Sequence, residues 1–299
     1  MKYIVIPFLL FTVIISQAQL LDTYQGKLYD GECIFNKKFI KQNKIKRITG
    51  KISIKREMHP IYHEGTIDDY TFNEQGQLVE RIKSFRLRGG HIDTTQDYFK
   101  YNDLEHIVSQ TTVTLSGYNS IRFKYDSLGN VMNETYSRGE NRSPYSYNLE
   151  KGRETILKDE SYDYKELSDS SHKKIYFNSA NKPYKETIIT TNSLGQRISE
   201  NTRFYLTSKK ESVSFQYDVQ GRLIKIIDYS NLLGVQTITY TYEYDEFGNL
   251  YSSKIYKNGK LTYSQEFLYH VQTFLLKAQL TKEESNNSIK IIEYEYEYF

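Results

Sequence analysis

Two histidines in this chain have a spacing that could suit a metal ion. His59 and His63 are four residues apart, so on a helix they would share a face and could bind zinc. Pro60 and the strand-forming residues around it argue against a helix, and in a strand the two imidazoles would lie about 13 Å apart. We therefore expect a solvent-exposed loop here and predict no metal site.

The acidic residues occur in two arrangements that could do chemistry. Residues 159–163 (DESYD), with Glu166 and Asp169, are acidic but lack the ordered ligand spacing of a calcium loop, so a solvated loop is expected. Asp68 and Asp69 are adjacent, and adjacent strand residues point to opposite faces, which argues against a glycosidase carboxylate pair. We predict no catalytic residue and no cofactor.

Tyrosine is the outlier of the composition, with 29 of 299 residues, while tryptophan is absent. Tyr240, Tyr242 and Tyr244 alternate with polar residues, and Tyr217 and Tyr125 hold equivalent positions in similar segments. Such rows stabilise a wide sheet as cross-strand neighbours. On a surface they could also stack on sugars or grip a protein. These five are the candidate surface aromatics, for an unknown protein or a cell-envelope glycan.

A nonapeptide recurs along the chain and explains most of these aromatics. It reads aromatic-x-aromatic-Asp/Asn-x-x-Gly-x-aliphatic. The clear copies are 215–223 (FQYDVQGRL), 242–250 (YEYDEFGNL) and 123–131 (FKYDSLGNV), and the looser ones are 70–78 and 190–198. Asp at the first turn position bonds backbone groups ahead of it, and Gly at the fourth supplies the left-handed conformation of a bulged hairpin. The predicted turn residues are Asp126, Gly129, Asp218, Gly221, Asp245 and Gly248.

The spacing of the turns predicts one repetitive domain. Gly195, Gly221 and Gly248 are 26 and 27 residues apart, which leaves two long strands per unit. The interval from Gly76 to Gly129 holds two units, and the missing turn falls in 98–107, where the glycine is lost. The register slips between 129 and 195. We expect a single β domain over 19–299, with its clearest repeats at about 60–260 and no convincing helical periodicity after residue 20.

The first 18 residues read as a secretory signal peptide. A short positive start is followed by an apolar run to Ile15, and Ser16 and Ala18 place small residues before a cleavage site. Export to the periplasm or the outside of a bacterial cell follows. The single Cys33 makes an internal disulfide impossible. The net charge of +3 is spread along the chain without a basic block, so no nucleic-acid partner is implied.

The turns resemble the YD repeats of the bacterial RHS family. The matching residues are Tyr125-Asp126 with Gly129, Tyr217-Asp218 with Gly221, and Tyr244-Asp245 with Gly248. In that family hairpins wind into a hollow shell. The chain also resembles small secreted bacterial proteins of unknown function with a porin-like barrel fold. Both resemblances imply a scaffold, and neither transfers a catalytic residue.

The last strand bears on a possible membrane barrel. Glu293, Glu295 and Glu297 lie in phase with the terminal Phe299, and a row of carboxylates is costly in lipid. We predict no stable membrane insertion. The expected fold is all-β, with consecutive long antiparallel hairpins forming a large curved sheet, a closed up-and-down barrel or a spiral. The leading function is a non-enzymatic binding or scaffold module at the cell envelope; a secreted carbohydrate-active enzyme and an outer-membrane barrel are the alternatives.

Overall fold

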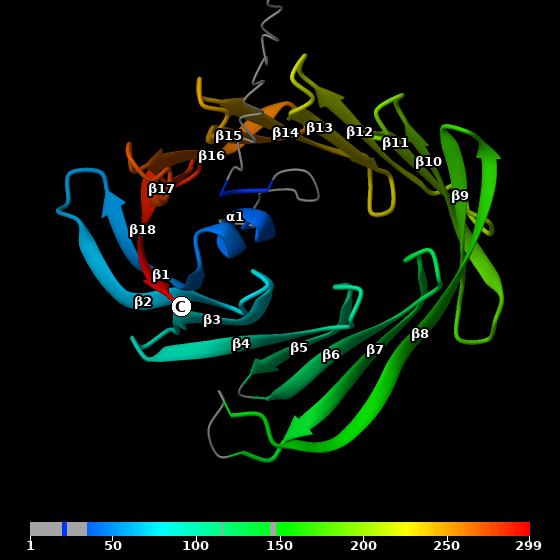
Figure 1. The fold of residues 1–299 in the computed structure, drawn as a ribbon, viewed down its shortest axis with the longest axis horizontal. Helices are drawn as coiled ribbons and strands as arrows, with labels where there is room; N and C mark the ends of the chain where they lie inside the picture. Colours follow the sequence, from blue (N-terminus) through cyan, green and yellow to red (C-terminus); the bar gives the residue numbers. More distant parts are fainter. Residues whose placement is uncertain (1–19, 23–34, 115, 144–147) are drawn as a thin grey trace, which may run out of the picture.

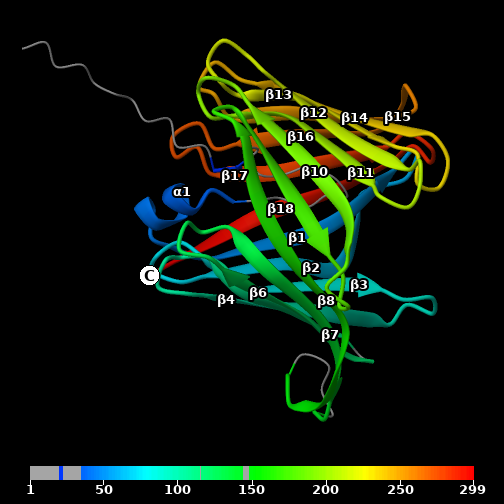
Figure 2. The same ribbon diagram turned by 90° about the vertical axis from the view of Figure 1, so that its right-hand side faces the viewer.

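The strands form one closed barrel (Figures 1 and 2). The computed structural model describes residues 20–22, 35–114, 116–143 and 148–299. Each strand pairs antiparallel with its neighbours in the chain, and the first strand, β1 (Ile45–Arg56), pairs with the last, β18 (Ser288–Tyr298). The expected all-β fold is confirmed, and of the three expected forms the chain adopts the closed up-and-down barrel.

The barrel has eighteen strands and the described residues add one short helix, α1 (Lys37–Gln42). The strands between β1 and β18 are β2 (Tyr62–Phe72), β3 (Leu78–Arg86), β4 (Ile92–Tyr101), β5 (Ile107–Thr114), β6 (Gly117–Tyr125), β7 (Val131–Asn141), β8 (Lys151–Ser168), β9 (Ser171–Phe177), β10 (Pro183–Thr191), β11 (Arg197–Phe204), β12 (Lys210–Tyr217), β13 (Leu223–Ser230), β14 (Gln236–Tyr244), β15 (Leu250–Lys257), β16 (Lys260–Tyr269) and β17 (Leu276–Glu283).

The repeated turns have the geometry that their sequence predicts. Gly129, Gly221 and Gly248 have φ of 84°, 79° and 87°, and each donates its amide to the carbonyl of the aspartate three residues earlier, at 3.2, 3.0 and 3.0 Å. The aspartate side chain accepts the amides that follow, as Asp218 does from Gln220 and Arg222 at 3.0 and 2.8 Å. These bonds all lie within the turn itself, and the Gly221 carbonyl also accepts from Gln196 Nε2 of a neighbouring turn at 2.7 Å.

The degenerate copies also close hairpins. The turn that lacks a glycine lies where the spacing predicts it, between Asn102 and Glu105, and Glu105 takes φ of 65°. A similar turn from Asn178 to Asn181 joins β9 to β10. It follows an odd-numbered strand, whereas the other Asp/Asn turns follow even-numbered strands, so it lies at the opposite end of the barrel. This change of end is the register slip between residues 129 and 195.

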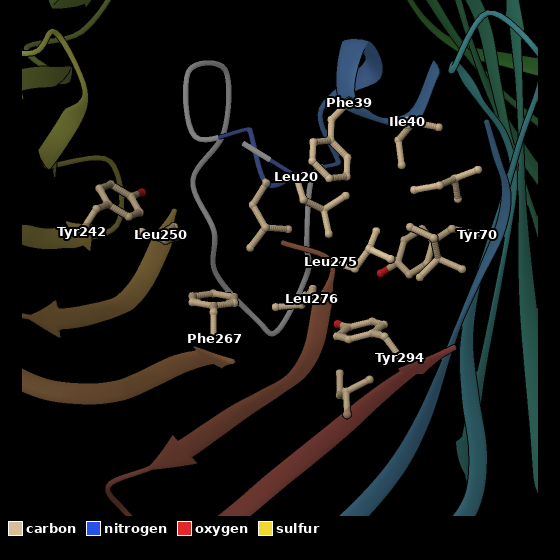
Figure 3. Close-up of a cluster of buried hydrophobic side chains, with 14 of the residues drawn as sticks. Leu20, Phe39, Ile40, Tyr70, Tyr242, Leu250, Phe267, Leu275, Leu276 and Tyr294 are labelled. Carbon is tan, nitrogen blue, oxygen red and sulfur yellow. The ribbon is translucent and has the colours of Figure 1, made fainter. Parts of the chain in front are cut away.

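One half of the interior is filled by the chain's own N-terminal segment (Figure 3). Residues 20–22 and 35–43, here called the plug, include the buried side chains of Leu20, Leu21, Phe39 and Ile40. The Phe35 ring packs edge-on against Tyr70, with ring centroids 4.9 Å apart. The barrel side chains that meet the plug come from β13–β18, β1 and β2, and burial of this apolar surface stabilises the barrel.

Helix α1 was not expected from the sequence. It is only six residues long, and its start is fixed by the Asn36 side chain, which accepts the amides of Lys38 and Phe39 at 2.9 and 3.3 Å. A helix this short shows no detectable periodicity. The helix lies against the β2–β3 turn and turns its apolar face into the barrel.

The acidic stretch was expected to be a loop, and that expectation is wrong. Residues 159–163 and Glu166 lie within β8. Tyr162 and Tyr164 alternate with charged residues there, which is the pattern of a strand with one wet face. Among the expected features, the signal peptide, the cleavage site before Gln19, and Cys33 lie outside the described residues.

Charged and hydroxyl side chains occupy many of the outward positions on β1, β14 and β18. Lys51 pairs with Glu295 across β1 and β18, and Arg47 lies 3.9 Å from Glu297. On β14 the outward positions are occupied by threonines and by Glu243, which is paired with Lys254 at 3.2 Å. No helix in the described part of the chain is long and apolar enough to cross a membrane.

Candidate functional site

Two regions of the barrel interior differ in exposure. From β13 through β18 to β2, the inward side chains meet the plug and are mostly buried. From β7 to β12 most inward side chains are only half-buried, which means that water reaches them. Barrels of 16–18 strands are too wide for their own side chains to fill. We call this second region, the inward faces of β7–β12, the open half.

The strand register identifies which side chains line the open half. Paired residues of neighbouring strands share a face. Tyr240, which faces the plug, pairs with Ile226, and Ile226 pairs with Phe215. Following the pairs onward through β11 and β10 places Lys174 of β9 on the same inward face. The lining of the open half includes Tyr162, Tyr164, Lys174, Tyr176, Lys185, Glu134, Glu160 and Glu200.

Two lysines of the open half rest on tyrosine rings. Lys174 Nζ lies 3.7 Å from the ring centroid of Tyr162 and 4.9 Å from that of Tyr176. Lys185 Nζ lies 4.4 Å from the centroid of Tyr176. Ring faces attract ammonium groups. Within the described residues, neither ammonium makes an ion pair or a hydrogen bond, although Glu134 and Glu160 attract Lys174 and Glu160 attracts Lys185 from a greater distance.

The carboxylates near the two lysines are already engaged. Each accepts from a hydroxyl, an ammonium or a guanidinium, either on its own strand, as from Lys158 and Arg197, or on a nearby strand, as from Tyr162 and Tyr184. The partners are Lys158 and Tyr184 for Glu160, Tyr162 for Glu134, and Arg197 for Glu200. The acidic groups are therefore neutralised or hydrogen-bonded, while the two ammonium groups are not.

The protonation of these groups follows from their surroundings. Burial lowers the pKa of Lys174, Glu134 works against this shift, and the neighbouring charge of Lys185 adds to it. Burial works to raise the pKa of Glu160, but hydrogen bonding from Tyr184 and the ammonium of Lys158 outweigh it, so the pKa lies below its ordinary value. Burial raises the pKa of Tyr164 to about 12. At neutral pH Glu160 is ionised and Tyr164 is a neutral donor.

The carboxylates with clear pKa shifts all move in the same direction. A glycosidase pairs an ionised carboxylate with a carboxylic acid of raised pKa. Among the described residues, every carboxylate with a clear pKa shift has it lowered, Glu160 and Glu154 included. The open half offers hydrogen-bond donors, acceptors and aromatic faces, which are the groups of a binding site.

The structure separates the five candidate aromatics into two sets. Tyr240 and Tyr242 are buried, 5% and 3% exposed, against the plugged interior, so they do not form the surface that we expected. Alternation alone does not reveal that the plug covers this face. Tyr125, Tyr217 and Tyr244 are half-buried at strand ends. A ligand role for any of the five stays a prediction.

The three strand-end tyrosines belong to a ring of hydrogen bonds around one end of the barrel. In each, the hydroxyl donates to the carbonyl of the first residue of the preceding odd-numbered strand, at 2.6–3.0 Å. The seven bonds run from Tyr101 to Leu78, Tyr125 to Ile107, Tyr164 to Val131, Tyr217 to Arg197, Tyr244 to Leu223, Tyr269 to Leu250 and Tyr296 to Leu276. This bond ties each hairpin to the next and gives the repeated tyrosine a structural role.

The ring of bonds can be tested by removing one hydroxyl. We expect Tyr244→Phe to lower the free energy of unfolding by about 1 kcal/mol, because the Leu223 carbonyl loses its donor. The measurement is urea unfolding of the purified barrel. Tyr298→Phe is the control, since Tyr298 is 52% exposed and should change stability little. Equal effects of the two substitutions would contradict a structural role for the strand-end hydroxyls.

The remaining candidates of the sequence lie apart from the open half. The loop expected for the two histidines is confirmed for His59, which lies in the exposed β1–β2 turn, and wrong for His63, which lies in β2 with Nδ1 2.7 Å from Ser53 Oγ. Asp68 and Asp69 face opposite sides of β2, as the alternation predicts: Asp68 pairs inward with Arg81. In the described ranges no three His, Cys, Asp or Glu side chains converge as a metal site would require.

A cavity of about 660 Å³ opens at the end of the barrel opposite α1. Its floor is apolar, with Ile238, Tyr240 and Ile255, and its rim carries Lys257 and Lys260. Neither this cavity nor the lysine–tyrosine cluster was identified from the sequence. The only sequence signal for the cluster is spacing: Tyr162 and Tyr164 are two residues apart, and so are Lys174 and Tyr176. This spacing places each pair on one face of its strand but does not show whether that face points inward.

Comparisons with solved structures give matches of low sequence identity and low TM-score. The chain is similar to a solved porin-like protein from Bacteroides uniformis at 12% identity, covering 85% of this chain and 97% of that one with a TM-score of 0.37. A porin-like protein from Bacteroides vulgatus matches at 9% identity, 85% and 99% coverage and a TM-score of 0.33. A LolA superfamily protein from Nitrosomonas europaea matches at 9% identity, 86% and 89% coverage and a TM-score of 0.17.

At these identities and TM-scores, the fold assignment rests on the strand pairing of this chain. No protein-family model matches it, and no curated protein sequence does. The solved structures named above include porin-like proteins, the class named in the second resemblance. The resemblance to the RHS family stays a prediction from the turn residues.

Proposed function

We propose that the protein is an exported, non-enzymatic binding module of the cell envelope, with its ligand site in the open half of the barrel. The observation that carries this proposal is the half-buried inward lining of β7–β12, where tyrosines, lysines and carboxylates meet in a barrel too wide to fill itself. A lining of this kind suits a hydroxyl-rich ligand, because tyrosine offers both a ring face and a polar tip. The ligand we favour is a glycan of the cell envelope.

Export and solubility complete the proposal. The expected signal peptide would be removed after Ala18, leaving Gln19 as the first residue. Leu20 and Leu21, directly beyond that site, are buried in the plug, so the new N-terminus would begin at the barrel. The ion pairs on the outward faces, such as Lys254 with Glu243, would be costly in lipid, which supports a barrel surrounded by water.

Purified protein starting at Gln19 can be tested against a panel of envelope glycans, with binding and product formation measured on the same samples. We expect binding without turnover, recovery without detergent, and a mature mass that corresponds to a Gln19 start. Tyrosine fluorescence is a convenient signal because tryptophan is absent. Turnover abolished by one acidic substitution would overturn the non-enzymatic proposal, and co-fractionation with outer-membrane proteins would overturn the soluble one.

A further inference from the structure

The free charges of the open half point to the chemistry of its ligand. Lys174 and Lys185 sit on neighbouring strands, and both approach the Tyr176 ring, at 4.9 and 4.4 Å. An ammonium without a hydrogen-bond acceptor retains three unused donors. Two such groups side by side also repel each other, and Lys185 lowers the pKa of Lys174. A negative group placed between them would relieve this repulsion and accept their hydrogen bonds.

The neighbouring carboxylates restrict what that negative group can belong to. Glu134 and Glu160 are both bonded by the Tyr162 hydroxyl, at 3.1 and 3.4 Å. Glu134 keeps lone pairs that can accept hydroxyl groups, whereas Glu160 is 5% exposed and both its oxygens are already bonded. The two carboxylates together would repel a ligand that is negatively charged along its whole length. The open half is therefore suited to a ligand in which isolated acidic groups alternate with hydroxyls.

We propose that the open half binds an acidic oligosaccharide, with the carboxylate of a uronic acid held between Lys174 and Lys185 and a sugar hydroxyl directed to Glu134. This inference rests on the proposed function, since it names the class of glycan. A lipid is a poorer fit because the apolar part of the interior that could take a tail is largely filled by the plug. The tyrosine rings hold the lysines in place and present ring edges to the sugar.

The test uses the mature protein and pairs of oligouronates with their carboxyl-reduced, neutral counterparts. Binding is followed by calorimetry and tyrosine fluorescence. We expect the acidic member of at least one pair to bind tenfold or more tightly than its neutral counterpart. The double variant Lys174→Gln with Lys185→Gln should lose this preference, and Lys174→Arg should keep it because the positive charge remains.

The matched control is Lys173→Gln. Lys173 is adjacent to Lys174 but on the outward face, where its Nζ lies 3.1 Å from Glu186. It should keep the full preference for the acidic ligand. Thermal unfolding of each variant checks that the barrel is intact, and Lys174→Gln alone replaces the double variant if that one does not fold.

The outcomes separate this inference from the proposed function. Equal binding of acidic and neutral members would overturn the acidic-sugar assignment and leave glycan binding standing. Preference retained in the double variant, or lost equally in Lys173→Gln, would also overturn it. Binding to anionic phospholipid vesicles in place of the oligosaccharides, or no binding of either member of any pair, would overturn both.

Discussion

Gly76→Ala is expected to release the plug from the barrel. A Cβ on Gly76 would lie 2.3 Å from the carbonyl oxygen of Lys37 and 2.9 Å from the amide nitrogen of Lys41, both in the backbone of α1. Since backbone atoms in a helix cannot yield locally, α1 must move and part of the burial of Phe39 and Ile40 is lost. We expect the free energy of unfolding to fall by about 3 kcal/mol in addition to the cost of backbone strain in the turn, because apolar burial is lost.

Gly195→Ala is the matched control for that strain. Gly195 occupies the same kind of turn, with φ of 74° against 79° for Gly76, and a Cβ there meets nothing within 4 Å. Both substitutions force alanine into the left-handed region at about 1 kcal/mol. Urea unfolding gives the difference, and trypsin should cut after Lys37 and Lys41 faster in the Gly76 variant only. Identical losses in both variants would mean that the plug does not depend on this contact.

Arg81→Leu is expected to destabilise the barrel by about 3 kcal/mol, because it leaves a buried carboxylate without its partner. Asp68 is 2% exposed, and both its oxygens accept from Arg81 at 2.9 Å. The Tyr70 hydroxyl also donates to it, at 3.0 Å. Urea unfolding measures the loss.

Two further variants interpret that measurement. Adding Asp68→Asn to Arg81→Leu removes the stranded charge and should restore a large part of the lost stability. Lys51→Gln breaks an ion pair whose two side chains are 59% and 63% exposed, and it should cost well under 1 kcal/mol. If the double variant is no more stable than Arg81→Leu alone, the stability came from Arg81 packing on the Tyr70 ring and not from the charge pair.

Local features were predictable from the sequence because short-range geometry determines them. Asp218 and Gly221 make their turn through bonds within five residues, so the pattern predicts the turn wherever it occurs. The turn that has Glu105 in place of glycine keeps its hydrogen bonds, since the Asn102 side chain still accepts the amides of Leu104 and His106. Alternation predicts two faces for each strand in the same local way.

The tertiary structure decided which of those faces points inward and what covers it. Tyr242 and Tyr164 both alternate with polar residues, but Tyr242 is buried beside the plug and Tyr164 lies in the open half. Closure of β1 on β18 joins residues more than two hundred positions apart, as in the pair Lys51 and Glu295. The sequence by itself therefore determined turns, strands and alternation. The closure of the barrel, the position of the plug and the lining of the open half arise from contacts between distant segments, which no local pattern encodes.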